Sequence, residues 1–182
     1  LVEKALAGKN VARVKGGDPF IFGRGGEEAQ ELLKAGVEFE IIPGVSSSYA
    51  APAYAGIPVT HRDYASSFHV ITGHESADKT GLVLDYATLA KEEGTLVFLM
   101  GLKNLPHIAE ELIAHGKDPK TPAAVVQAGT TARQRVVTGV LESIAETAKQ
   151  VGIQTPAITV VGDVVTLQKQ LSWLGDKPLF GK

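Results

Sequence analysis

The 182-residue chain contains no cysteine, and only one methionine and one tryptophan. Without cysteine it can form neither a disulfide nor a thiolate metal site, which favours an intracellular origin. It contains no apolar run long enough to span a bilayer and no signal-peptide pattern, so we expect a soluble protein. The net charge of −2 argues against binding to nucleic acid through bulk positive charge. A cytoplasmic protein without nucleic-acid or membrane partners is therefore expected.

The composition is typical of a globular protein, with 44% hydrophobic and 21% charged residues. The length allows one large domain or two small ones. Residues 1–7 have the pattern of the last turns of a helix that Gly8 closes, without an initiator methionine or an N-cap before them. We therefore expect that residues upstream of Leu1 are missing from this sequence. The alternative is a short N-terminal helix that begins raggedly.

Segments with strand and helix periodicity alternate along the chain, which indicates an α/β protein. The predicted strands are residues 11–14, 38–42, 68–72, 95–100, 123–127, 135–138 and 157–161. The predicted helices are residues 27–35, 46–55, 104–115 and 141–150. We expect mainly parallel or mixed sheets with helices on both faces, and antiparallel strands near the end of the chain. The stretch 55–63 has no clear period, so we place a domain junction near residues 60–66 and predict domains 1–64 and 65–182.

The strongest local signal lies between Val14 and Glu28. A predicted strand runs into Gly16-Gly17-Asp18-Pro19, and three more glycines precede the next helix. Glycines at the carboxyl end of a strand let a ligand approach the backbone closely, and this edge is where open α/β sheets bind ligands. The alternative is a tight turn that needs glycine for its geometry alone. The segment contains neither a Gly-x-Gly-x-x-Gly dinucleotide motif nor a P-loop.

Three further strand ends carry small-residue turns. They are Pro43 to Ser48, Met100-Gly101 and Gln127 to Thr131. The amides and hydroxyls after Pro43 suit a carboxylate or a ribose, although plain helix capping explains them equally well. Four such turns are expected if one extended ligand lies across the carboxyl edge of the sheet.

Few charged side chains stand out beside these turns. Arg24 and Arg62 lie next to glycine- or proline-rich turns and together suit a polycarboxylate, because arginine binds carboxylates through paired hydrogen bonds. Glu27 begins a helix, where the dipole favours its ionised form, and it is a candidate base or substrate anchor. For each of the three, an ordinary surface role is the alternative. The five histidines show no metal-ligand spacing.

Six strings of the sequence together resemble a known family. They are Val14-Lys-Gly-Gly-Asp-Pro-Phe-Ile-Phe-Gly-Arg-Gly-Gly-Glu-Glu28, Pro43-Gly-Val-Ser46, Ala55-Gly-Ile-Pro-Val-Thr-His-Arg62, Val70-Ile-Thr-Gly-His74, Leu99-Met-Gly101 and Gln134-Arg-Val-Val-Thr-Gly139. This set closely resembles the uroporphyrinogen-III C-methyltransferases within the tetrapyrrole methylase family. The similarity runs over nearly all of the chain, and the order and spacing of the strings agree with the family.

The resemblance implies two α/β domains with S-adenosylmethionine in the cleft between them, in a homodimer. The residues that it implies around the cofactor are Gly16, Gly17, Asp18, Ile21, Ser46, Ser47, Met100, Ala128 and Gly129. It makes Glu27 and Arg62 the candidate catalytic residues, with Arg62 on a substrate carboxylate and Glu27 assisting proton removal. No metal is implied.

The implied reaction methylates uroporphyrinogen III at C-2 and C-7, giving precorrin-2 for siroheme or cobalamin and releasing S-adenosylhomocysteine. The family pattern also has an N-terminal segment with a first strand and a Gly-x-Gly-Pro-Gly-Asp loop, which is absent from this sequence. Two alternatives therefore stay open: another precorrin methylase, and a fragment that keeps the fold without activity. A nicotinamide-dependent oxidoreductase is disfavoured by the missing dinucleotide motif.

Overall fold

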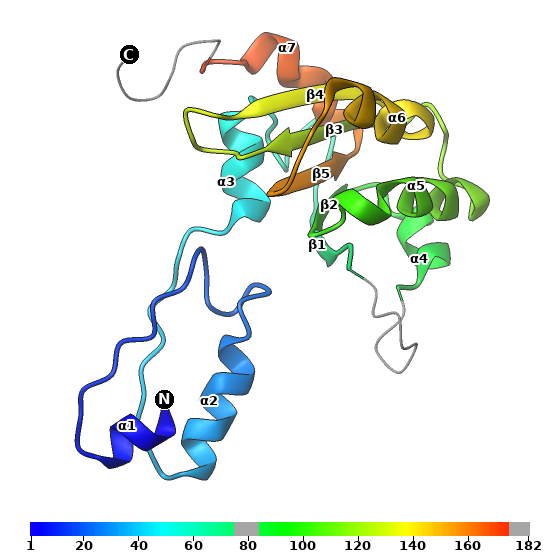
Figure 1. Cartoon of the computed structure of the whole chain (residues 1–182). Helices are drawn as coiled ribbons and strands as arrows, with labels where there is room; N and C mark the ends of the chain where they lie inside the picture. Colours follow the sequence, from blue (N-terminus) through cyan, green and yellow to red (C-terminus); the bar gives the residue numbers. More distant parts are fainter. Residues whose placement is uncertain (75–83, 175–182) are drawn as a thin grey trace. The chain divides into compact units, whose positions relative to one another are not determined.

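The computed structural model describes residues 1–74 and 84–174 (Figure 1). The chain forms two compact units, Leu1–Ser46 and Ser47–Lys182. Within the described ranges, all the strands belong to the second unit. Each unit is therefore described by itself.

The second unit is built on a five-stranded mixed sheet (Figure 1). Its strands are β1 (Phe68–Thr72), β2 (Thr95–Leu99), β3 (Pro122–Gln127), β4 (Arg135–Val140) and β5 (Ala157–Val161), in the spatial order β1-β2-β5-β3-β4. The pairing of β1 with β2 is parallel, whereas β2–β5, β5–β3 and β3–β4 are antiparallel. Of the two expected kinds of sheet, mainly parallel and mixed, this unit has the mixed kind, because β5 inserts between β2 and β3 in the opposite direction. The expected antiparallel strands near the end of the chain are confirmed.

Helices cover both faces of this sheet, as the sequence predicts. On one face lie α4 (Tyr86–Lys91), α5 (Leu105–Ala114) and α6 (Leu141–Val151), and on the other lie α3 (Ser47–Tyr54) and the 3-10 helix η2 (Asp163–Leu167). The short helices η1 (Leu102–Asn104) and α7 (Gln168–Leu171) complete the unit. The predicted helices at 46–55, 104–115 and 141–150 are thus confirmed within two residues, whereas the sequence reading missed α4.

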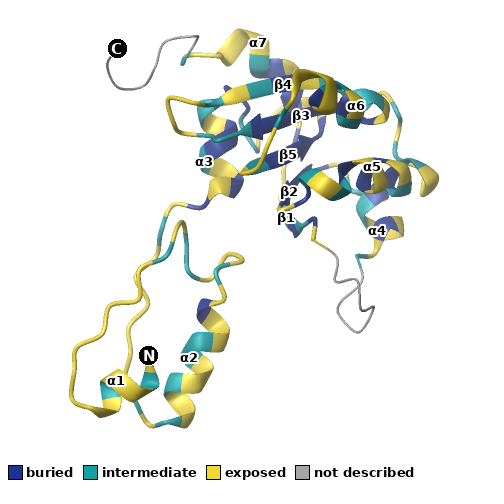
Figure 2. Cartoon of the chain, viewed as in Figure 1, coloured by how far each residue is buried: buried dark blue, intermediate teal, exposed yellow. Residues whose placement is uncertain are grey.

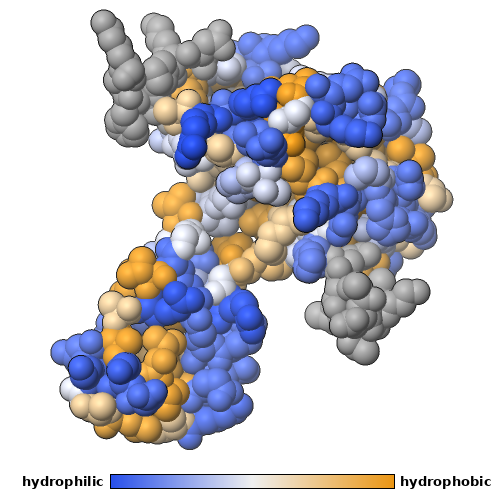
Figure 3. All heavy atoms as spheres, in the orientation of Figure 1, coloured by the Kyte–Doolittle hydropathy of each residue, from blue (hydrophilic) through white to orange (hydrophobic). Residues whose placement is uncertain are grey.

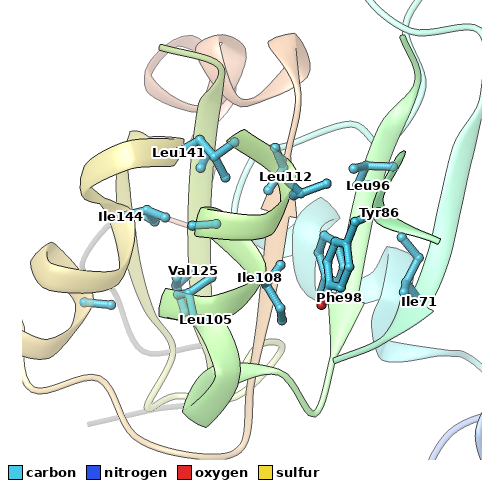
Figure 4. Close-up of a cluster of buried hydrophobic side chains, with 14 of the residues drawn as sticks. Ile71, Tyr86, Leu96, Phe98, Leu105, Ile108, Leu112, Val125, Leu141 and Ile144 are labelled. Atoms are coloured by element: carbon cyan, nitrogen blue, oxygen red, sulfur yellow. The ribbon is translucent and has the colours of Figure 1, made fainter. Parts of the chain in front are cut away.

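The core follows from alternation along the buried strands. In β2, Leu96 and Phe98 face α4, α5 and α6, while Val97 and Leu99 face α3 and η2. All five residues of β2 are buried, which explains its uninterrupted apolar run. Figure 4 shows Leu105, Ile108 and Leu112 on one side of α5, pointing at the sheet. This spacing of three and four residues is the helical period that predicts α5.

The first unit contains two helices, α1 (Val2–Leu6) and α2 (Gly25–Lys34). Helix α2 ends in a glycine motif: Gly36 has φ +67° and the N–H of Val37 donates to the carbonyl of Leu32. Both helices agree with the sequence prediction. Although the helical spacing places Leu33 on the same side of α2 as Leu32, the Leu33 side chain is 71% exposed.

The strands predicted at residues 11–14 and 38–42 are not formed. A strand needs a neighbour for its backbone hydrogen bonds, and neither segment pairs with any described part of the chain. Their apolar side chains are exposed, with Val14 at 82% and Ile42 at 74%. Exposed residues dominate the first unit in Figure 2, and hydrophobic atoms gather on its surface in Figure 3. The hydrophobic pattern alone was therefore insufficient to make these segments strands.

The compact units are not the same as the predicted domains, 1–64 and 65–182. Helix α3 and Ile57 pack against the sheet of the second unit, so the contact boundary lies at Ser46/Ser47. The division into domains and the cleft between them stay predictions. The sequence Gly73-His-Glu-Ser-Ala-Asp78 predicts a loop after β1, and most of it falls outside the described residues. Among the residues described, no helix combines the length and the apolar character that a membrane span requires.

Candidate functional site

Three strands of the second unit end at the same edge of the sheet. Strands β1 and β2 are parallel, and both β2 and β3 are antiparallel to β5, so all three run in one direction. Their last residues lead into Gly73, Met100 and Ala128. The structure thus brings together two of the four strand-end turns that the sequence marked, Met100-Gly101 and Gln127 to Thr131, within one sheet edge. Such an edge is the usual place for a ligand in an open α/β sheet.

Two of these turns have strained backbones. Met100 has φ +58° and Ala128 has φ +46°, which is the left-handed region that side chains other than glycine rarely adopt. Thr130 follows with φ +69°. Such residues cost about 1–2 kcal/mol each and cluster at binding sites, where the surrounding structure holds them. The side chain of Met100 is also exposed, at 56%, so it is available to a ligand.

Glycines allow the close packing behind these turns. A Cβ at Gly73 would overlap the Cα of Gly101, and a Cβ at Gly129 would overlap the Cβ of Ala51 in α3. The side-chain amide of Asn104 also donates to the carbonyl of Gly73 at 2.8 Å. Gly73 after β1 and Gly129 after β3 are therefore required by the close approach of neighbouring atoms.

In the first unit, Asp18 joins two loops. One carboxylate oxygen accepts the N–H of Phe20 at 2.8 Å, and the other accepts the N–H of Gly44 at 2.9 Å. The hydrogen bond from Gly44, followed by that from Phe20, holds the pKa of Asp18 below its ordinary value. Gly17 has φ +83°, and a Cβ on Gly44 would come within 2.5 Å of the Gly17 carbonyl oxygen. The two glycine loops of this unit are thus packed together, with Asp18 between them.

A network of ion pairs and a hydrogen bond links the same loop to helix α2. The ammonium of Lys15 lies 2.7 Å from a carboxylate oxygen of Glu28 and donates to the carbonyl of Gly23 at 2.5 Å. Arg13 pairs with the other oxygen of Glu28 at 3.3 Å. The hydrogen bond from Lys15 is the main reason that the pKa of Glu28 is lowered. Lys15 therefore connects the start of the glycine loop with helix α2.

The two candidate catalytic residues lie in different units. Glu27 is exposed at the start of α2, 3.5 Å from the guanidinium of Arg24, and it lines an open groove of about 650 Å³ that also includes Lys15 and Glu28. Arg62 is exposed in the turn between the bridge partners His61 and Ala65. Their predicted roles stay predictions. No group of three or more histidine, aspartate or glutamate side chains within 1–74 and 84–174 is arranged to hold a metal.

The other predicted cofactor residues also differ in their exposure. Ser46 is 3% exposed and immediately precedes α3, whereas Ser47, the first residue of that helix, is exposed. Ile21 is 37% exposed. Gly44 and Lys15 were not predicted as site residues, although the strings Pro43-Gly44 and Lys15-Gly16 contain them. Gly44 packs against Gly17, and Lys15 binds the Gly23 carbonyl and the Glu28 carboxylate. A sequence pattern does not reveal such contacts.

Comparison with known proteins identifies the family. The model of the family described as "Tetrapyrrole (Corrin/Porphyrin) Methylases" matches residues 1–145. The chain belongs to the tetrapyrrole methylase family. This result confirms the resemblance drawn from the six sequence strings.

Two relatives of this tetrapyrrole methylase are informative. A protein of Methanosarcina barkeri named S-adenosyl-L-methionine-dependent uroporphyrinogen III methyltransferase is 57% identical over 92% of the chain. The uroporphyrinogen-III C-methyltransferase of Bacillus subtilis is 52% identical over all of it. The chain spans 66% of the length of the first protein and 38% of the second.

Solved structures agree with this assignment. The uroporphyrin-III C-methyl transferase of Thermus thermophilus, complexed with S-adenosyl homocysteine, has a TM-score of 0.77 and 39% identity, and the match covers 91% of this chain and 71% of that one. A cobalt precorrin-4 methyltransferase has a TM-score of 0.79 at 27% identity, covering 90% and 68%. The predicted α/β fold of the tetrapyrrole methylases is thereby confirmed.

Proposed function

We propose that the protein methylates uroporphyrinogen III at C-2 and C-7 with S-adenosylmethionine, forming precorrin-2 and S-adenosylhomocysteine. The observation that carries this proposal is the identity of 57% with the Methanosarcina methyltransferase, which extends over 92% of the chain. The shared sheet edge supports it, because the family resemblance assigns two of the strand ends found there, Met100 and Ala128-Gly129, to the cofactor.

The residues of the chain suit such a cofactor. Met100 and Ala128 have left-handed backbones where β2 and β3 end, and the exposed Met100 side chain offers an apolar contact. Small residues leave room for a ligand to lie against the backbone. We propose that the cofactor contacts are Gly16, Gly17, Asp18, Ile21, Ser46, Ser47, Met100, Ala128 and Gly129.

The protein's task in this reaction is mainly positioning. When bound, S-adenosylmethionine supplies an electrophilic methyl group on a sulfonium sulfur. Arg62 binds an acetate or propionate arm of the substrate through paired hydrogen bonds and so orients the pyrrole carbon that attacks. Glu27, in the first turn of α2, accepts the proton that leaves when ring conjugation is restored. The guanidinium of Arg24 lies 3.5 Å from the Glu27 carboxylate and pairs with it.

The biological setting belongs to the same proposal. We expect the protein to act in the cytoplasm as a homodimer, and to supply precorrin-2 for siroheme or cobalamin. The siroheme branch is favoured by a siroheme synthase of Acinetobacter baylyi that is 51% identical over 96% of the chain.

Turnover with methyl-labelled S-adenosylmethionine tests the proposal. The chain is incubated with uroporphyrinogen III, and we expect label in precorrin-2 at C-2 and C-7. Because the relatives are longer, a second protein carries this chain in place of the matching segment of the Methanosarcina enzyme. If neither protein transfers label while the unaltered Methanosarcina enzyme does, the proposal is wrong, and a fold without activity becomes the better interpretation.

A precorrin methylase acting at another ring position is the second candidate. The TM-score of 0.79 with the cobalt precorrin-4 methyltransferase favours it, whereas the identity of 27%, against 39% for the Thermus enzyme, disfavours it. The position of the labelled methyl group distinguishes the two. Label on a precorrin substrate and none on uroporphyrinogen III would establish the second candidate.

A further inference from the structure

The side chain of Gln134 connects the turn after β3 with the end of helix α3. Its oxygen accepts the backbone N–H of Thr130 at 2.9 Å, and its nitrogen donates to the carbonyl of Tyr54 at 3.0 Å. Tyr54 is the last residue of α3 and is 80 positions away in the sequence. One half-buried amide therefore uses both of its ends to hold two distant elements together.

The turn that Gln134 holds is strained and tightly packed. Ala128 and Thr130 have left-handed backbones, and the Thr131 hydroxyl donates to the carbonyl of Ala128 at 2.7 Å. Gly129 lies against Ala51 in the middle of α3 so closely that a Cβ would not fit. Strained turns persist only where their surroundings determine them, and here the Gln134 amide provides a polar link to α3.

We propose that Gln134 is a positioning residue, which presents the backbone of Ala128 and Gly129 to the cofactor by fixing this turn against α3. The inference rests on the proposed function, because that function assigns the two residues to the cofactor. The proposed role requires a side chain as long as glutamine that both accepts a hydrogen bond and donates one. Glutamate accepts without donating when ionised, and leucine does neither.

The test compares three variants of the chain by calorimetric titration with S-adenosylhomocysteine. Gln134→Leu removes both hydrogen bonds, and Gln134→Glu keeps an acceptor for Thr130 but loses the donor to Tyr54. Trp173→Phe is the matched control, since the indole N–H of Trp173 donates to the carbonyl of Ala53 at 3.0 Å, one residue before Tyr54. It weakens the same helix end without touching the turn.

We expect both Gln134 variants to lose about tenfold in affinity, the effect of one or two hydrogen bonds, and Trp173→Phe to bind like the parent chain. Amide exchange at Thr130 should accelerate in Gln134→Leu, while β2 and β5 stay protected. Equal affinity in all variants overturns the inference. So does an equal loss in Trp173→Phe, which would show that only the end of α3 matters.

Failure of the proposed function gives a different result. In that case the parent chain itself does not bind S-adenosylhomocysteine. Exchange at Thr130 then decides whether Gln134 fixes the turn: acceleration in Gln134→Leu supports it, and unchanged exchange overturns it.

Discussion

The carboxylate of Asp18 shows how one side chain can organise a loop. Its two oxygens accept N–H groups from its own loop and from Gly44, which is 26 positions away. Since both bonds favour the charged form, the pKa of Asp18 in the folded unit lies below that in the unfolded chain. The ionised side chain therefore stabilises the folded loop above the unfolded pKa. This contribution is lost as the pH falls through the folded pKa.

An NMR titration that follows the Asp18 carboxyl carbon and the Gly44 amide tests this account. We expect both signals to share a midpoint below that of an aspartate in an unstructured peptide. Asp18→Asn should abolish the Gly44 titration and accelerate exchange of that amide. A midpoint at or above the peptide value would contradict the assigned hydrogen bonds.

Met100 allows strain and binding to be separated. Its φ of +58° suits glycine, so Met100→Gly should relieve about 1 kcal/mol of strain, offset in part by the larger entropy of unfolded glycine. The free energy of unfolding should therefore stay level or rise slightly, while the affinity for S-adenosylhomocysteine falls because the exposed side chain is gone. Met100→Ala, which keeps the strain, is the control for lost side-chain contact. A marked loss of stability in Met100→Gly would refute this account.

At the level of elements, the ends of β1 and β2 depend on two glycines. A Cβ at Gly73 would overlap the Cα of Gly101, and backbone cannot move aside as a flexible side chain does. Gly73→Ala should lower the free energy of unfolding by about 1–3 kcal/mol, the usual effect of overpacking. Gly139→Ala, where the nearest atoms lie 3.7 Å from the new Cβ, is the matched control and should be close to neutral. Chemical denaturation measures both, and equal effects would be evidence against the close approach.

At the scale of the whole molecule, the two units differ in how much they bury. Among the described residues of the first unit, only Gly25 and Ser46 are buried, whereas β2 and β3 of the second unit are almost wholly so. Protection against hydrogen exchange follows burial and backbone pairing. We expect amides of β2, β3 and β5 to exchange orders of magnitude more slowly than those of residues 11–14 and 38–42. Comparable protection in the two groups would show that the latter segments are paired.

Both hydrophobic clusters found among the described residues belong to the second unit, so we expect the two units to respond independently to mutation. Phe98 is fully buried among α4, α5 and the sheet, so Phe98→Ala should cost the second unit about 3–5 kcal/mol. The chemical shifts of α2 should not change. Denaturation followed by tryptophan fluorescence reports on the second unit, since Trp173 is the sole tryptophan of the chain. Simultaneous loss of α2 signals in the variant would show that the two units unfold together.

The sequence by itself determined the strands and the longer helices of the second unit, two of the glycine turns at its strand ends and the family. Helical and strand periods are local properties, and glycines mark strand ends without reference to the rest of the chain. Tertiary structure alone decided that β5 inserts between β2 and β3, that residues 11–14 and 38–42 stay unpaired, and that Asp18 and Gln134 bond to partners far along the chain. Strand pairing and such hydrogen bonds depend on which segments meet, and the local period of a sequence contains no record of that.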